Sequence, residues 1–257
     1  MYTLKNNTPK SRVYKLKVST HIKCKRKESL VSNFSVTKSN SLVDASYKLN
    51  AQAQKLVLAC LGKVDSRGEI PKEITLTASE FSELMDIDIK NAHRELYKAA
   101  DTLFKSSIIL RDSNEETELY WVQKKAKKTK GEGAVTLTWS DDVLKYISQL
   151  KSRFTTYKLK NIAHLQSSHS IRMYELLMKF NSTGERVIYL DDFKSVLGIS
   201  DKYPAFKELT RRVIKPAIDE LNQRSDLLIT YETIKKGRSV VMLSFSFKQN
   251  KQMKLDV

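Results

Sequence analysis

The chain repeats one order of sequence patterns about 112 residues apart, and this repetition limits the folds open to it more than any other feature. Each half reads as a helix, a short strand, two helices and a two-stranded hairpin. Three sets of residues correspond between the halves. Phe81, Leu84, Met85 and Ile87 match Phe193, Val196, Leu197 and Ile199 in that order. Glu95 and Leu96 match Glu208 and Leu209, and Asp101 and Leu103 match Asp219 and Leu221. Because single apolar matches arise by chance, the shared order of elements is what predicts a duplicated unit.

Local signals define the elements of the first half. The stretch "YKLNAQAQKLVLACLGKV" has apolar residues at helical spacing, with Asn50 in a capping position. The strand "EITL" follows, and Thr77 and Glu80 then have capping-box spacing at the start of a second helix. "DIKNAHRELYKAADTLFKS" predicts a third helix, and "SIILRD", "TELYWVQ" and "AVTLTWS" predict strands, the last two joined by a loop rich in lysine.

The second half repeats this order more compactly. "HSIRMYELLMKF" and "DDFKSVLGI" predict helices on either side of the strand "RVIYL", and residues 205–226 predict a longer helix. "LLITYETI" and "SVVMLSFSF" predict a hairpin in which Gly237 supplies the turn. Two helices joined by a tight turn and followed by a hairpin form a winged helix-turn-helix, whose third helix is shaped to enter a major groove.

The predicted fold class is therefore α+β, with two tandem winged-helix domains related by internal duplication. We expect a basic N-terminal arm over residues 1–40, a first domain over 41–152, a second over 153–250 and a tail over 251–257. The arm holds ten Lys or Arg and one acid, Glu28, which suits either attraction to phosphate or solubility.

Positive charge dominates the composition. The 46 Lys and Arg against 29 Asp and Glu give a net charge of +17, which favours a polyanionic partner. Nucleic acid is the first choice, because no terminal basic helix with a bulky apolar face points to a membrane surface. With no run of 18 apolar residues and no apolar signal core, we expect a cytoplasmic protein without a membrane partner.

The helix predicted in 205–226 has an unusual order of charges. Phe206, Leu209, Val213, Ala217 and Leu221 form one apolar stripe, and basic residues line the opposite side. Cations come early and acids late, the reverse of what the helix dipole favours, so a partner that attracts positive charge to the leading half is indicated. Pro216 removes a backbone donor and is expected to kink the helix near Arg212.

These patterns give two sets of candidate DNA-binding residues. In the second unit they are Lys202, Lys207, Arg211, Arg212 and Lys215 on and before the long helix, and Lys235, Lys236 and Arg238 at the hairpin tip. In the first unit they are Lys90, Asn91, Arg94 and Lys98 on the equivalent helix, and Lys124, Lys125, Lys127 and Lys128 at the predicted wing tip. Lysines at wing tips suit phosphate contacts without base selectivity.

Sequence signals for an enzyme are weak. The chain has no G-x-x-x-x-G-K-[ST] phosphate loop, and its four histidines are scattered without the spacing of a metal site. We therefore expect no enzymatic activity, no cofactor and no metal.

Four stretches within residues 40–248 carry a resemblance to a known family, namely "LVDASYKLNAQAQKLVLACLGKV", "YLDDFKSVLGI", "FKELTRRVIKPAIDELNQRSD" and "KKGRSVVMLSFSF". In these stretches the sequence resembles the replication initiators of iteron-containing, theta-replicating plasmids. The resemblance implies monomers that bind direct repeats in a plasmid origin and recruit the host initiator and the replicative helicase. It also implies a homodimer, in equilibrium with the monomer, that represses the protein's own gene.

Applied to this sequence, the resemblance makes the second unit the main reader and gives the first unit lighter DNA contacts and a part in dimer formation. Two alternatives stay open from the sequence: a winged-helix transcription regulator without an initiator role, and a metal-dependent nickase.

Overall fold

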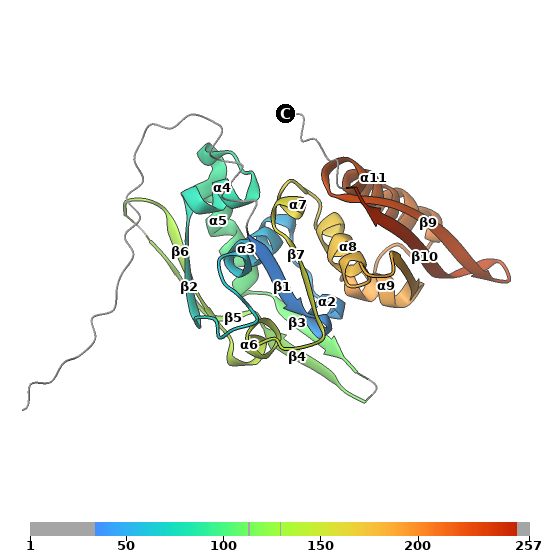
Figure 1. The fold of residues 1–257 in the computed structure, drawn as a ribbon, viewed down its shortest axis with the longest axis horizontal. Coiled ribbons are helices and arrows are strands. Elements are labelled where there is room, and N and C mark those ends of the chain that lie inside the picture. The colour runs from blue at the N-terminus through green and yellow to red at the C-terminus, as the bar shows by residue number, and fades with distance from the viewer. Residues whose placement is uncertain (1–33, 113, 129, 251–257) are drawn as a thin grey trace, which may run out of the picture.

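The computed structural model describes residues 34–112, 114–128 and 130–250 (Figure 1). The predicted tail and residues 1–33 of the predicted arm lie outside the described residues. The elements up to the middle of the chain are β1 (Ser35–Ser39), α2 (Asn40–Asp44), α3 (Ala51–Gly62), β2 (Glu73–Thr77), α4 (Ala78–Met85), α5 (Ile89–Phe104), β3 (Ser107–Arg111), β4 (Glu116–Tyr120), β5 (Val122–Lys127), β6 (Ala134–Trp139) and α6 (Asp141–Ile147). The elements that follow are β7 (Phe154–Lys158), α7 (Lys160–Ala163), α8 (Ser168–Met178), β8 (Glu185–Tyr189), α9 (Leu190–Val196), α10 (Phe206–Leu209), a π-helical turn η2 (Thr210–Ile214), α11 (Lys215–Arg224), β9 (Leu227–Lys236) and β10 (Ser239–Gln249).

The first winged helix consists of α3, α4 and α5 packed on a three-stranded sheet of order β2-β6-β5. Asn50 caps α3 by accepting from the amide of Ala53. Thr77 and Glu80 form the predicted capping box at the start of α4. Both caps satisfy amides that a helix start leaves free, which explains why these helices begin where the sequence predicted.

The second winged helix has the same architecture. Its sheet has the order β8-β10-β9, so the short strand again lies beside the second strand of the hairpin. Figure 1 shows β9 and β10 as a long hairpin that extends from the body of this unit. Gly237 has a φ of 62° in the two-residue turn between the strands, as the sequence predicted. The shared sheet order confirms the predicted fold class of two tandem winged helices.

One predicted strand of the first unit is two strands in the structure. "TELYWVQ" divides at the buried Trp121 into β4, which pairs with β3, and β5, which pairs with β6. The β3–β4 hairpin is therefore an insertion before the wing of the first unit. The predicted lysine loop is also shorter than expected, because Lys124, Lys125 and Lys127 lie on β5.

The last residues of the predicted arm belong to the folded part of the chain. Ser35–Ser39 form β1, which pairs antiparallel with β7, and Val36 is fully buried. Strand β1 therefore joins the start of the described chain to residues that follow the first winged helix.

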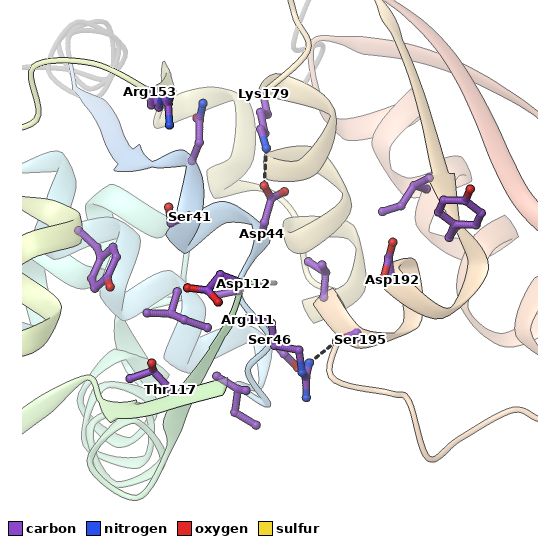
Figure 2. Close-up of a pocket in the computed structure, with 18 of the residues that line it drawn as sticks. Ser41, Asp44, Ser46, Arg111, Asp112, Thr117, Arg153, Lys179, Asp192 and Ser195 are labelled. Carbon is purple, nitrogen blue, oxygen red and sulfur yellow. Dashed lines mark hydrogen bonds and ion pairs between the residues drawn. The ribbon is translucent and has the colours of Figure 1, made fainter. Parts of the chain in front are cut away.

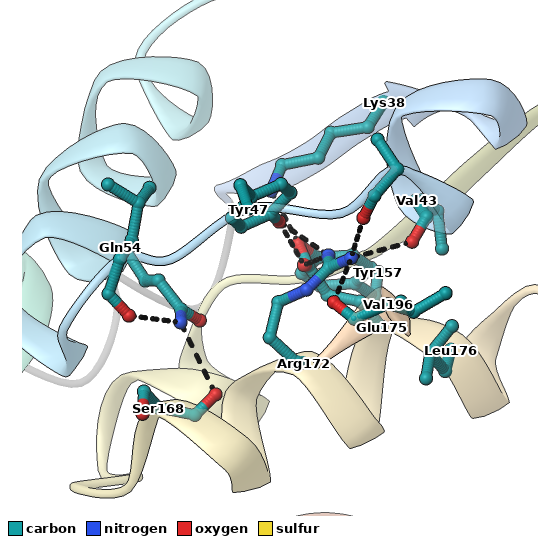
Figure 3. Close-up of polar contacts among 12 residues, drawn as sticks. Lys38, Val43, Tyr47, Gln54, Tyr157, Ser168, Arg172, Glu175, Leu176 and Val196 are labelled. Atoms are coloured by element: carbon teal, nitrogen blue, oxygen red, sulfur yellow. Dashed lines mark hydrogen bonds and ion pairs between the residues drawn. The ribbon is translucent and has the colours of Figure 1, made fainter. Parts of the chain in front are cut away.

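A cluster of buried charges lies where β1, β7 and α8 meet (Figure 3). Glu175 accepts from Lys38 Nζ at 2.6 Å and from Arg172 Nη1 at 2.8 Å, and Tyr47 and Tyr157 also donate to it. Burial alone acts to raise the pKa of Glu175, but the charges of Lys38 and Arg172 outweigh it and lower the pKa to about 2. The carboxylate is thus ionised and surrounded by donors inside the protein.

The same cluster connects the two winged helices. Arg172 Nη2 donates to the backbone oxygens of Val43 at 2.9 Å and Ala45 at 2.8 Å, and more weakly to that of Val196 at 3.5 Å. Val196 ends α9 of the second unit, whereas Val43 belongs to α2. Arg172 therefore contacts both sides of the junction.

Candidate nucleic-acid interface

The long helix of the second unit presents the predicted basic face. It runs through α10, η2 and α11, and its predicted stripe is buried at Leu209, Val213, Ala217 and Leu221, with Phe206 half-buried. Arg211 and Arg212 keep 62% and 56% of their side-chain surface exposed. Lys207 and Lys215 are exposed on the same helix, and Lys202 is exposed just before it. The structure thus places the predicted arginines outward and the apolar stripe inward.

Where the sequence predicted a kink near Arg212, the structure has a π-helical turn that ends just before Pro216. The amide of Lys215 donates to the carbonyl of Thr210, five residues earlier, in place of the usual four. Because proline lacks an amide hydrogen, the carbonyl of Arg212 loses its helical partner, and the wider turn precedes that point. Within this turn Val213 and Ile214 are buried, whereas both arginines face solvent.

An acidic residue pairs with both of these arginines. Glu208 Oε2 accepts from Arg211 Nη2 at 2.9 Å and from Arg212 Nε at 2.8 Å. The hydrogen bond from Arg211, which has the larger effect, and the one from Arg212 lower the pKa of Glu208 to about 2. The carboxylate is therefore ionised at neutral pH. Glu208 was absent from the predicted site, although its spacing of three and four residues from the arginines is readable in "ELTRR".

The wing of the second unit adds basic residues close to the start of this helix. Lys235, Lys236 and Arg238 are exposed at the tip of the β9–β10 hairpin. A groove of about 570 Å³ separates the hairpin from the helices, and its lining includes Lys235, Arg238 and Lys194. Lys194, on α9, was absent from the predicted site because the sequence gave it no distinguishing pattern. The structure brings these basic residues to the groove between helix and wing.

The equivalent helix of the first unit, α5, also carries exposed lysines and an arginine paired with an acid. Lys90 and Lys98 are exposed, but Arg94 donates to Asn91 Oδ1 at 2.9 Å and to Glu95 Oε1 at 3.1 Å. Asn91 and Arg94 are therefore together, as their spacing of three residues on a helix allows.

Three of the predicted first-wing lysines are engaged by α5 and its neighbours. Lys125 and Lys127 both pair with Asp101, and hydrogen bonds from these lysines lower the pKa of Asp101. Lys124 lies 3.6 Å from Glu73, and Lys128 is exposed, with its backbone oxygen accepting from Tyr97. The sequence placed these lysines in a loop at the wing tip, but Lys124, Lys125 and Lys127 lie on strand β5, which turns Lys125 and Lys127 toward Asp101 of α5.

A cleft of mixed charge lies between the two units (Figure 2). Its volume is about 750 Å³, and Figure 2 shows Asp44 and Lys179 joined across one side. Arg111 of the β3–β4 hairpin donates to Ser195 of α9 at its other side. Because its lining holds acids as well as bases, this cleft lacks the uniform positive charge that attracts a polyanion.

In residues 34–112, 114–128 and 130–250, no three His, Cys, Asp or Glu side chains gather as metal ligands. Within the same ranges, no helix combines the length and the apolar character needed to span a bilayer.

Comparison with known proteins places this architecture in a family. The model of the family described as "Initiator Replication protein, WH1" matches residues 35–178, more than half of the chain. The chain belongs to this family. A second family model, described as "Initiator Rep protein, WH2", matches residues 189–247. This membership agrees with the expectation of a DNA-binding replication initiator.

Individual relatives agree with the family match. A replication initiation protein from Escherichia coli is 28% identical over 236 residues, which cover 88% of this chain and 73% of the relative. An uncharacterized 27.6 kDa protein from Escherichia coli is 22% identical over 84% of this chain and 95% of its own length. The crystal structure of the Pi initiator protein in complex with iteron DNA superposes with a TM-score of 0.74 at 24% identity, covering 86% of this chain and 99% of that one. The last comparison shows that the folds are alike.

The division between the units can be placed from contacts as well as from sequence. Strand β7 follows residue 152 but pairs with β1, and α8 packs against α3 of the first unit. We propose that the first domain extends through β7, later than the predicted division between residues 152 and 153, and that α8, which packs against both α3 and α11, joins it to the second.

Proposed function

We propose that this protein initiates plasmid replication by binding repeated sites, or iterons, in an origin, with the second winged helix as the main reader. The observation that carries the proposal is the exposed arginine pair on the third helix of that unit, within a chain of the initiator family. The likeness in fold to an initiator that was crystallised with iteron DNA supports the same assignment.

The candidate residues fall into two groups, those suited to contact base edges and those suited to contact phosphates. Arg211 and Arg212 stand on the helix that enters a major groove in winged helices, and arginine pairs the two acceptors of a guanine edge. Arg211 is the first choice for a base contact. Lys207 and Lys215 flank the arginines, while Lys235, Lys236 and Arg238 suit the phosphates beside the groove.

We assign the first unit a lighter role. Lys90, Lys98 and Lys128 are exposed and suit phosphate contacts, whereas Lys125 and Lys127 are engaged by Asp101. If both third helices bind one face of a duplex, they occupy successive major grooves about 10 base pairs apart. A monomer then covers about two turns of DNA.

The finer parts of the proposal rest on the resemblance in sequence and on family membership. We propose that the bound monomer recruits the host initiator and the replicative helicase in the cytoplasm. We also propose that a homodimer in equilibrium with the monomer represses the protein's own gene. Sedimentation of the protein with and without a single repeat tests this equilibrium, since DNA that selects monomers shifts the distribution toward one protein per site.

Footprinting on the DNA that flanks the gene tests the main proposal. The expected result is protection of several tandem repeats, together with replication of a plasmid that carries this DNA and the gene. Protection of one promoter palindrome, without replication, overturns the proposal in favour of a transcription regulator. The salt concentration is kept fixed throughout, because phosphate contacts make affinity strongly salt-dependent.

A further inference from the structure

A carboxylate lies on the basic face of the reader helix, which is the continuous helix formed by α10, η2 and α11. Glu208 is in the first turn of α10, and both arginines of the following turn donate to it, at 2.9 Å and 2.8 Å. Both bonds go to Oε2, and within the described residues Oε1 of Glu208 accepts no hydrogen bond. An acid in this position reduces the attraction of the face for phosphate, so its presence on a DNA-binding helix needs a reason.

The contacts leave the arginines able to read a base. Arg212 donates to Glu208 through Nε alone, and in the described part of the chain neither of its terminal nitrogens has a hydrogen-bond partner. Arg211 uses only Nη2. A guanidinium has five donors in a planar fork, so one donor can be fixed by the carboxylate while others reach the two acceptors of guanine.

Exposure makes the pairing reversible. Glu208 keeps 40% of its side-chain surface exposed, and both arginines keep more than half. Ion pairs between exposed side chains contribute little stability and are screened by salt. The pairing therefore orients the arginines without locking them away from an arriving duplex.

We infer that Glu208 is a positioning residue that holds Arg211 and Arg212 for base contacts and opposes their use on phosphates. This inference rests on the proposed function, because it assigns selectivity within the same reader helix. A carboxylate repels every phosphate alike, so it weakens binding to all sequences. At a site whose bases accept hydrogen bonds from the positioned arginines, these contacts restore the affinity that phosphate repulsion removes. The difference between the specific and the non-specific affinity therefore grows.

The first unit provides a parallel at the matching position. Glu95 corresponds to Glu208 and is hydrogen-bonded to Arg94 at 3.1 Å. There the acid engages one arginine next to it in sequence, whereas Glu208 engages two arginines on the following turn. The second unit thus has one carboxylate, that of Glu208, placed to hold both arginines proposed to contact bases.

The experiment compares the full-length parent with Glu208→Gln on duplexes with and without the repeat, across a range of salt concentrations. Glutamine keeps the shape and removes the charge. We expect tighter non-specific binding, a salt slope steeper by up to about 0.9, and a ratio of specific to non-specific affinity at least about fivefold lower. Glu69→Gln is the matched control, since Glu69 is exposed and forms no ion pair within the described residues. Circular dichroism checks that both variants unfold at the temperature of the parent.

A double-mutant cycle separates positioning from a general charge effect. In a background of Arg211→Ala and Arg212→Ala, the change Glu208→Gln is expected to leave the affinity ratio unaltered, because the groups it positions are absent. An equal fall in that background overturns the inference. So does a ratio within about twofold of the parent for Glu208→Gln alone, which is too small for a lost base contact. If the parent itself shows no preference for the repeat, the proposed function fails.

Discussion

Arg211 and Arg212 share one turn of the reader helix, and their exposure is the property on which the proposed base contacts depend. Arg211→Ala is expected to weaken binding to the repeat by about 1–3 kcal/mol and to relax the preference at one base position. Competition with repeats that are substituted at each position measures both effects. Arg67→Ala is the control, because Arg67 is an exposed arginine in a turn of the first unit, paired with Asp65. If Arg211→Ala bound every substituted repeat with the affinity of the parent protein, the assignment of the reader helix would be wrong.

The sequence predicted single residues well where one helix decides their environment. The stripe through Leu209, Val213 and Leu221 follows from helical spacing alone, and these residues are buried. Pairs between elements were not predicted, because they depend on how a strand packs on a helix. Asp101 and Lys125 are 24 residues apart, and no local pattern indicates that they meet. Glu208 could have been found, since its partners are three and four residues away.

The two wings differ as elements, and this difference can be measured. Lys236 is exposed at the tip of the second wing, whereas Lys125 on the first wing pairs with Asp101 and lies 4.9 Å from the ring of Phe104. Lys236→Ala is expected to weaken binding to all sequences alike and to reduce the salt slope by about one unit. Lys125→Ala is expected to change the slope by less than half of that. Equal effects of the two substitutions would show that the pairing with Asp101 opens on DNA.

Elements defined by their own caps and turns were predictable, and elements defined by distant partners were not. The helices that begin at Asn50 and Thr77 and the turn at Gly237 have local causes that are visible in the sequence. The lysines of 124–127 resemble a solvated loop, yet pairing with β6 makes them a strand. Strand β1 depends in the same way on β7, more than a hundred residues later.

At the scale of the whole molecule, the junction between the units depends on charges that the sequence could not place together. Lys38, Arg172 and Glu175 come from β1 and α8, and each is almost completely buried. Buried ions lose their hydration, and only close partners offset that cost. Glu220 of α11 reinforces the junction, since it accepts from the amides of Gln166 and Ser167 at the start of α8. Polar contacts whose partners are far apart in sequence thus contribute to the relative position of the two units.

Removal of the central carboxylate is the sharpest test of this junction. Glu175→Gln leaves Lys38 and Arg172 buried without a counter-ion, so we expect the free energy of unfolding at pH 7 to fall by about 3–5 kcal/mol. Urea titrations measure this loss, and Glu185→Gln at an exposed position of β8 is the control, expected to change stability by less than about 0.5 kcal/mol.

The loss must also depend on pH in one direction. Because the pKa of Glu175 is lowered from 4.5 to about 2 in the folded protein, its contribution is complete above the unfolded pKa and is lost as pH falls through the folded pKa. Other carboxyl groups titrate in both the parent and Glu175→Gln, so they largely cancel in the comparison. The difference in stability between the two proteins is therefore expected to narrow as pH falls from about 4.5 to 2. A difference that stays constant over this range would mean that the charge of Glu175 does not hold the junction together, and that the packing of its side chain does.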